Sequence, residues 1–284
     1  MEIDHLKIFL DLTKTLHFGK TSRNCFLTPA SLTRLIQKLE KEVSRPLFIR
    51  DNRSVEITTA GVLFKEYCED QVSRWETLQD SIGNYSGAIT GLVRIYCSVT
   101  ASHSILSEVL EPIKAKHPGI TVSLETGPSE LTFQKIQNYE ADIGLTSFPE
   151  TLPQEIKARD IKKLSLSLIV PKGRSMEDIC SNELPFIYPK SGFARINMLR
   201  WFEIQNIAPR VYTEVSGFEG LMALVGLGYG ASVVPTLVYD TNPMKSKIDI
   251  IDLTIPIESL RLGICCKKKK TYSPIAGVFF TDNK

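Results

Sequence analysis

The sequence lacks the features that mark membrane, secreted and metal-binding proteins. It contains no apolar run of about 18 residues and no apolar signal segment at its start, so we expect a cytoplasmic protein that does not enter a membrane. Its six cysteines are scattered and form no Cys-x-x-Cys pair, which disfavours a zinc site. Cys265 and Cys266 are adjacent in an expected strand and therefore point to opposite faces, as packing residues do. We expect neither a metal nor a cofactor.

Catalytic motifs are missing as well. There is no glycine-rich phosphate loop, no His-Glu-x-x-His and no Gly-x-Ser-x-Gly, and only four histidines are present. Because an enzyme must bring a nucleophile, an acid or base and a stabilising group together, we do not expect catalysis. The net charge of +2 is too small for a strongly basic nucleic-acid-binding protein. However, residues 1–58 carry ten Lys and Arg against seven Asp and Glu, so the basic excess lies at the start of the chain.

What is present begins with a segment typical of a winged helix-turn-helix. The pattern predicts helices over 18–26 and 30–43, where Thr28 can cap the second helix and Pro29 can occupy its first position. The residues at helical spacing that would bury one face of the second helix are Leu32, Leu35, Ile36 and Leu39. Two expected strands, 46–50 and 54–58, would form a hairpin wing. The second helix would then present its other face to a DNA groove.

That outward face and the wing carry the candidate DNA contacts. Hydroxyl, amide and cationic donors are the groups that proteins use against base edges and phosphates. The candidates are Thr28, Pro29, Ala30, Ser31, Thr33, Arg34, Gln37, Lys38, Arg50 and Arg53.

A long helix is predicted from 59 to about 85. One stripe of it is apolar at steps of three and four residues, and its candidate dimerisation residues are Phe64, Cys68, Trp75, Leu78 and Ile82. Two interpretations remain open: the stripe packs on the head, or it pairs with the same helix of another subunit. We favour the second, because a dimer suits a two-fold symmetric operator. Small residues over 86–91 then form a hinge.

Beyond the hinge, expected strands and helices alternate, which favours mostly parallel sheets with helices on their faces. The expected strands are 93–97, 121–125, 142–145, 165–170, 186–188, 211–215, 231–234 and 260–266, and the expected helices are 104–116, 131–139, 197–205 and 218–227.

The loop 98–102 follows a strand and precedes a helix, so it presents hydroxyls and backbone N–H groups that favour an anion. The alternative is ordinary helix capping. Ligands of open α/β sheets collect at strand ends, where this chain places other small polar residues. Arg195 could pair with a ligand charge or form a surface ion pair. The candidate effector-binding residues are Ser98, Val99, Thr100, Ala101, Gly127, Thr146, Ser147, Ser191, Gly192, Arg195, Gly217 and Pro235.

The basic run 267–270 has two open interpretations, a DNA-contacting patch or a solvated strand end, of which we favour the second.

Several of these segments resemble the DNA-binding region of LysR-type transcriptional regulators: 18–19, 28–36, 39–40 and 46–61. Leu35 departs from the family, which usually has Gln there, and 44–45 is also atypical. The resemblance extends over nearly the whole chain. It implies a mixed α+β and α/β protein with a winged helix-turn-helix head (1–58), a linker helix and hinge (59–91) and an effector-binding domain (92–284). That domain would resemble periplasmic binding proteins, with subdomain I about 92–161 and 267–284 and subdomain II about 162–266.

Within the family, the segments 48–53, 97–101, 149–153 and 201–202 resemble an activator of the acetohydroxy acid isomeroreductase gene. This resemblance implies double-stranded promoter DNA as partner, RNA polymerase as a further one, and a homodimer or tetramer. It also implies a small carboxylate effector such as 2-acetolactate or 2-aceto-2-hydroxybutyrate. One alternative is a LysR-type regulator that senses another small anion, or the redox state through Cys180. A cytoplasmic solute-binding module and an enzyme are more remote alternatives.

Overall fold

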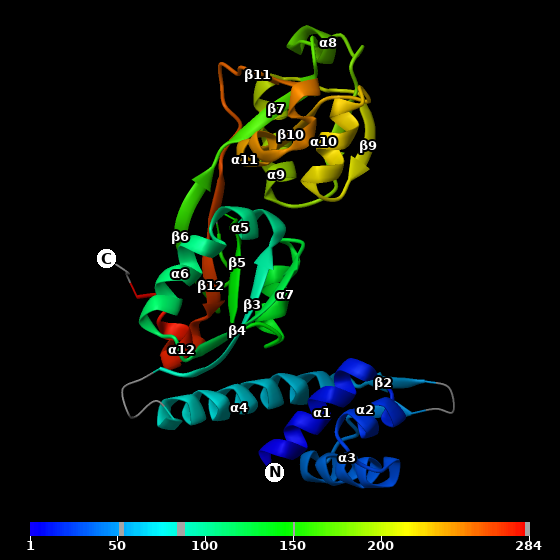
Figure 1. Ribbon diagram of the computed structural model, residues 1–284. Helices are drawn as coiled ribbons and strands as arrows, with labels where there is room; N and C mark the ends of the chain where they lie inside the picture. Colours follow the sequence, from blue (N-terminus) through cyan, green and yellow to red (C-terminus); the bar gives the residue numbers. More distant parts are fainter. Residues whose placement is uncertain (51–53, 84–88, 150, 282–284) are drawn as a thin grey trace. The chain divides into compact units, whose positions relative to one another are not determined.

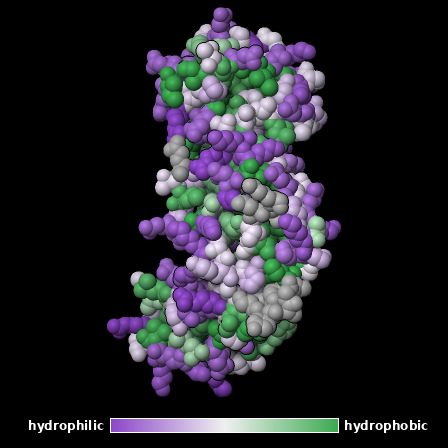
Figure 2. Space-filling view, turned by 90° about the vertical axis from the view of Figure 1, so that its left-hand side faces the viewer, coloured by the Kyte–Doolittle hydropathy of each residue, from purple (hydrophilic) through white to green (hydrophobic). Residues whose placement is uncertain are grey.

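The computed structural model describes residues 1–50, 54–83, 89–149 and 151–281. It divides the chain into two compact units, Met1–Gly87 and Ala88–Lys284, each with its own hydrophobic core (Figure 1). On the face shown in Figure 2, hydrophilic and hydrophobic residues are interspersed in small patches. Among the helices of the described ranges, none combines the length and the hydropathy that a membrane span requires.

The first unit is a winged helix-turn-helix followed by a long helix, as expected. Its elements are α1 (Ile3–Thr15), α2 (Phe18–Asn24), α3 (Pro29–Val43), the antiparallel strands β1 (Phe48–Arg50) and β2 (Val55–Ile57), and α4 (Thr59–Gly83). Thr58, directly after β2, caps α4: its hydroxyl accepts the N–H of Gly61 at 2.9 Å and donates to the carbonyl of Pro46 at 2.8 Å. A Cβ atom on Gly61 would stand 2.2 Å from the carbonyl oxygen of Leu47, so only glycine permits this approach. The wing tip, including Arg53, lies outside the described residues.

The apolar stripe of α4 has two different environments. Phe64, Cys68 and Val72 are buried in the head core, where the Phe64 ring lies 4.9 Å from that of Phe9. The assignment of Phe64 and Cys68 to a subunit contact was therefore wrong, because packing on α1 already covers them. Further along, the stripe is exposed: the exposed fractions are 41% for Trp75, 48% for Leu78 and 65% for Ile82.

The second unit contains a five-stranded sheet and a second group of strands. The five strands, in the order β4-β3-β5-β12-β6, are β4 (Ile120–Gly127), β3 (Gly91–Ser98), β5 (Ile143–Ser147), β12 (Leu260–Lys267) and β6 (Ile156–Leu164). The helical segments of this half are α5 (Val99–Ser104), α6 (Leu106–Lys116), α7 (Leu131–Gln137), η2 (Lys268–Tyr272) and α12 (Pro274–Gly277).

The other half contains the three-stranded sheet β10-β7-β11 and the parallel pair β8-β9. Its strands are β7 (Leu166–Pro171), β8 (Phe186–Pro189), β9 (Val211–Val215), β10 (Ser232–Pro235) and β11 (Ile248–Ile251). Its helical segments are α8 (Met176–Cys180), α9 (Phe193–Gln205), α10 (Phe218–Gly226), α11 (Thr236–Thr241) and η1 (Pro243–Lys247).

The strand pairing corrects two expectations. Strand β12 pairs antiparallel with both β5 and β6, so residues 260–266 lie in the first sheet and not in the second half, to which the family resemblance assigned them. Strands β10 and β11 are also antiparallel to β7, so the sheets are more mixed than expected. The chain consequently crosses between the two halves twice, from β6 into β7 and again before β12 (Figure 1).

Candidate DNA-binding surface and effector cleft

Helix α3 has one buried face and one polar face. The Thr28 hydroxyl accepts the backbone N–H of Ser31 at 3.1 Å, and Pro29 occupies the first turn, where no N–H donor is required. Leu32, Ile36 and Leu39 are completely buried in the head core. The buried face fixes the orientation of the helix, so the opposite face is presented as a rigid surface.

The candidate contacts lie on that exposed surface. Seven of them are exposed: Thr28, Pro29, Ala30, Ser31, Arg34, Gln37 and Lys38. Thr33 is half-buried, and Leu35 packs against the head core, where it presents no donor. The polar face of α3 therefore carries hydroxyl, amide and cationic groups together, as a groove-binding helix does.

Arg50, at the end of β1, is exposed but held in place. Its guanidinium carbon lies 4.2 Å from the ring centroid of Phe18, and one of its nitrogens lies 3.9 Å from Glu40 Oε2. The other carboxylate oxygen of Glu40 accepts the N–H groups of Leu47 and Phe48 at 2.9 and 3.3 Å. Glu40 thus ties the end of α3 to the wing and orients the Arg50 side chain.

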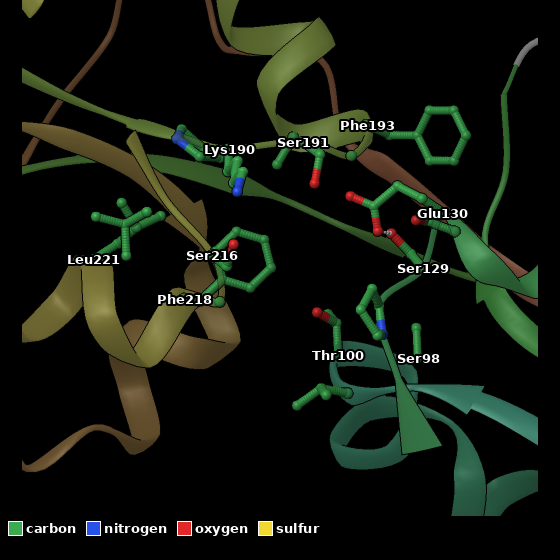
Figure 3. A pocket seen from close by; sticks show the side chains of 18 of the residues that line it. Ser98, Thr100, Ser129, Glu130, Lys190, Ser191, Phe193, Ser216, Phe218 and Leu221 are labelled. Carbon is green, nitrogen blue, oxygen red and sulfur yellow. Dashed lines mark hydrogen bonds between the residues drawn. The ribbon is translucent and has the colours of Figure 1, made fainter. Parts of the chain in front are cut away.

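A cavity of about 250 Å³ lies in the second unit and draws its walls from both halves (Figure 3). It is lined by Ser98, Val99, Thr100, Gly127, Pro128, Ser129, Glu130, Ser147, Pro189, Lys190, Ser191, Gly192, Phe193, Ala194, Val215, Ser216, Gly217, Phe218, Glu219, Leu221 and Leu260. Eight of the twelve candidate effector-binding residues are in this set: Ser98, Val99, Thr100, Gly127, Ser147, Ser191, Gly192 and Gly217.

The other four candidates lie elsewhere. Ala101 is buried in the main core, and Pro235 is a buried residue that precedes α11. Thr146 is the neighbour of Ser147 on β5; since alternate residues of a strand face opposite sides, it points away from the cavity. Arg195 lies 2.8 Å from Glu214 and donates to the carbonyl of Pro189 at 2.8 Å. The ion-pair interpretation of Arg195 is therefore the correct one.

Besides α7, which follows Glu130, helices α5, α9 and α10 begin at the cleft, and these three have different caps. The Ser98 hydroxyl accepts the N–H of Ala101 at 3.2 Å, so it caps α5, as the capping interpretation had it. Helices α9 and α10 instead begin at Gly192 (φ 90°) and Gly217 (φ 82°), left-handed positions that favour glycine and provide no side-chain cap. The first turns of these two longer helices are therefore the better anion positions.

The cleft contains charges that strand-end reasoning missed. Lys190 follows β8 and is exposed, without an ion-pair partner in the described part of the chain. Glu130 precedes α7, and Glu219 lies in the first turn of α10. Lys190 lies between the expected strand 186–188 and the candidate Ser191, and Glu130 lies three residues beyond the candidate Gly127, so including charged residues at these strand ends would have found both. Phe218 and Leu221 add apolar surface, so the cleft suits a small acid with a short aliphatic body.

The cysteines and the basic run singled out in the sequence lie outside the cleft. Burial raises the pKa of the Cys97 and Cys266 thiols to about 12, which disfavours the reactive thiolate. Cys180 is exposed on α8 and unpaired, outside the cleft. Lys270 is buried 3.2 Å from Asp142, so the end of the basic run packs in the fold. In the described ranges, no group of three His, Cys, Asp or Glu is placed to hold a metal ion.

Comparisons with known proteins agree with this architecture. A family model described as bacterial regulatory helix-turn-helix protein, lysR family, matches residues 3–62, and one described as LysR substrate binding domain matches 86–281. The chain is 34% identical to the transcriptional activator IlvY of Haemophilus influenzae, over 99% of both proteins. It is 31% identical to the regulator IlvY of Escherichia coli, over 99% of this chain and 98% of that protein.

Solved structures show the same fold. A full-length OxyR variant from Pseudomonas aeruginosa superposes with a TM-score of 0.73 at 16% identity, covering 98% of this chain and 93% of that one. Full-length CbnR in complex with its target DNA superposes with a TM-score of 0.66 at 20% identity, covering 99% and 97%. The matched relatives named above are regulators rather than enzymes. The chain therefore belongs to the LysR family of DNA-binding transcriptional regulators.

Proposed function

We propose that this regulator is an activator of branched-chain amino-acid biosynthesis whose effector is an acetohydroxy acid, 2-acetolactate or 2-aceto-2-hydroxybutyrate. The full-length similarity to IlvY activators supports the pathway. The observation that supports the effector class is the cleft, which combines two uncapped helix N-termini and Lys190 with hydroxyls and apolar side chains.

An acetohydroxy acid carries one carboxylate, one hydroxyl, one ketone and a short aliphatic part. The first turns of α9 and α10, with Lys190, suit the carboxylate. The hydroxyls of Thr100 and Ser191 face the same space from the two halves and suit the other oxygens (Figure 3). Because the cleft has walls from both halves, a bound effector favours one relative arrangement of them, and only such differential binding can shift the equilibrium between conformations.

The exposed face of α3 and the wing are the proposed contact with promoter DNA, through Thr28, Pro29, Ala30, Ser31, Thr33, Arg34, Gln37, Lys38, Arg50 and Arg53. The exposed half of the α4 stripe is the proposed subunit contact in a homodimer or tetramer. An activator of this kind acts in the cytoplasm together with RNA polymerase.

The subunit contact can be tested at Trp75. We expect Trp75→Glu to give smaller species in sedimentation, because it places an unpaired charge in an apolar contact. Far-ultraviolet circular dichroism should be unchanged, since Trp75 is already 41% exposed in the single chain. Sedimentation identical to wild type would remove α4 from the subunit contact.

The effector proposal is tested by a gel-shift and footprinting titration with promoter DNA. We expect the wild-type protein to bind without effector and the footprint to change on addition of freshly prepared 2-acetolactate. Acetate and L-valine serve as controls for a non-specific anion and for a pathway product. The same titration is repeated with 2-aceto-2-hydroxybutyrate. A footprint that responds to neither acetohydroxy acid would contradict the proposed effector but not the binding of DNA.

A further inference from the structure

Glu130 is an acidic side chain in a cleft proposed to bind an acid. It immediately precedes α7 in the first half, yet its carboxylate crosses to the second half. Its Oε1 atom lies 3.4 Å from the point where a Cβ atom on Gly192 would stand. The Ser129 hydroxyl donates to Oε2 at 3.3 Å. In Figure 3 the carboxylate points toward Ser191. One oxygen is thus held by its neighbour and the other is directed into the cleft.

A carboxylate in this position repels the carboxylate of a ligand, so it lowers the affinity for simple acids. An ionised carboxylate accepts hydrogen bonds but donates none. A hydrogen bond to Glu130 can offset this repulsion only if the ligand carries a hydrogen-bond donor close to the ligand's own carboxylate. The cationic and N–H groups at Lys190, α9 and α10 meanwhile take the ligand's acid group. This arrangement of charges therefore favours an acid that carries a hydroxyl group on the carbon next to its carboxylate.

We propose that Glu130 is a specificity-determining residue that accepts a hydrogen bond from the 2-hydroxyl of the effector, and that the cleft thereby selects 2-hydroxy acids over the matching acids without that hydroxyl. The inference rests on the proposed function, in that it deepens the assignment of the cleft. Glu130 explains why the effector needs a 2-hydroxyl group. The contacts to its aliphatic part and its ketone do not explain this.

The test measures a ratio of dissociation constants by calorimetry on the full chain. 2-Acetolactate is compared with 2,2-dimethyl-3-oxobutanoate, in which a methyl group replaces the hydroxyl, and 2-hydroxy-3-methylbutanoate with 3-methylbutanoate. In wild type we expect the hydroxy acid of each pair to bind about 10- to 100-fold more tightly, as for a hydrogen bond to a charged group. In Glu130→Gln and Glu130→Ala the ratio should fall to about threefold or less.

The ratio is the readout because removing any negative charge from the cleft strengthens the binding of every acid. Glu219→Gln is the matched control: Glu219 also lines the cleft, but its Oε2 lies 3.4 Å from the Cβ position of Gly217, beside the start of its own helix. We expect this variant to keep the wild-type ratio.

An unchanged ratio in both Glu130 variants, or an equal loss in Glu219→Gln, would overturn the inference. Failure of 2-acetolactate to bind the wild-type protein would overturn the proposed effector instead, and the second pair of acids would still decide the role of Glu130.

Discussion

The two surfaces proposed to bind ligands are built in opposite ways. The proposed DNA-binding surface lies mainly on one helix of 15 residues, α3, whose buried side is part of the head core. The proposed effector cleft takes its groups from the starts of α5, α7, α9 and α10 and from the ends of several strands, in two halves joined by two crossings of the chain. The first surface is complete as soon as the head folds. The second is complete only when its halves are correctly placed.

This difference assigns separate tasks to the two units. A rigid helix face can hold DNA whether or not an effector is present. A cleft with two walls changes its fit when the walls move, so it is the part that can respond to a small molecule. Variants that damage one unit should therefore leave the binding activity of the other intact.

The largest effect is expected from Phe64→Ala, which should destabilise the head and leave the second unit unchanged. Phe64 is buried against Phe9 in the head core, and deleting a buried phenyl group typically costs about 3–5 kcal/mol. We expect the denaturant transition of the head to shift by that amount and operator binding to be lost. Calorimetric binding of the effector should be retained.

Leu63→Ala is the control for this variant, because Leu63 is 64% exposed on the same helix. A head transition that is unchanged in Phe64→Ala would show that the first half of α4 does not support the head.

The converse variant is Asp142→Asn in the second unit. Burial by itself raises the pKa of Asp142, but hydrogen bonds from Arg94, at 2.9 and 3.0 Å, and the charge of Lys270 outweigh it and hold the pKa below its ordinary value of 3.8. The stabilisation is then complete above pH 3.8 and is lost as the pH falls from there through the lower pKa of the folded state.

Removing this carboxylate breaks the buried ion pair between Asp142 and Lys270, and breaking such a pair typically costs about 3 kcal/mol. We expect the denaturant transition of the second unit to shift by that amount at pH 7 and by less near pH 3. Operator binding without effector should be unaffected. Equal destabilisation at both pH values would contradict the role of the ionised carboxylate.

The same contrast explains what the sequence could predict. The caps and apolar spacing of α3 lie within 16 consecutive residues, so the pattern predicted the helix and most of its two faces correctly, except that Thr33 and Leu35 are both half-buried. The cleft depends on long-range partners. Arg195 was misassigned because Glu214, its partner, is 19 positions away on β9. Glu130 was missed because only small polar residues at the strand ends were taken as candidates, and the sequence does not show that the Glu130 side chain reaches Gly192.

Topology was the least predictable part. Residues 260–266 have an apolar pattern that fits either half, and only their antiparallel pairing with β5 and β6 assigns them to the first sheet. The stripe of α4 is similarly uniform in sequence, although one half of it is covered by α1 and the other is exposed.

A smaller effect is expected from Arg34→Ala on the DNA-facing surface. Arg34 is exposed on α3, and loss of a base contact typically costs about 1–3 kcal/mol and relaxes the preference for the operator. Titrations at one salt concentration should show that Arg34→Ala loses more affinity for operator DNA than for unrelated DNA. Arg45→Ala removes the same charge from an exposed site beyond α3 and should weaken both DNAs slightly and equally. If the two variants behave alike, Arg34 contributes only charge.

The smallest effect is expected from Thr100→Val in the cleft. The Thr100 hydroxyl faces the cavity but is only half-buried, so water can partly replace it, and we expect a loss of about 1 kcal/mol in effector affinity. The side-chain volume is nearly conserved in Thr100→Val, so stability should not change.

Ser102→Ala is the control, because the Ser102 hydroxyl donates to the Val99 carbonyl at 2.7 Å and does not line the cleft. Calorimetry with 2-acetolactate should therefore show weaker binding in Thr100→Val only, with operator affinity in the absence of effector the same in all three proteins. Equal effector affinity in the two variants would remove the Thr100 hydroxyl from the effector contacts.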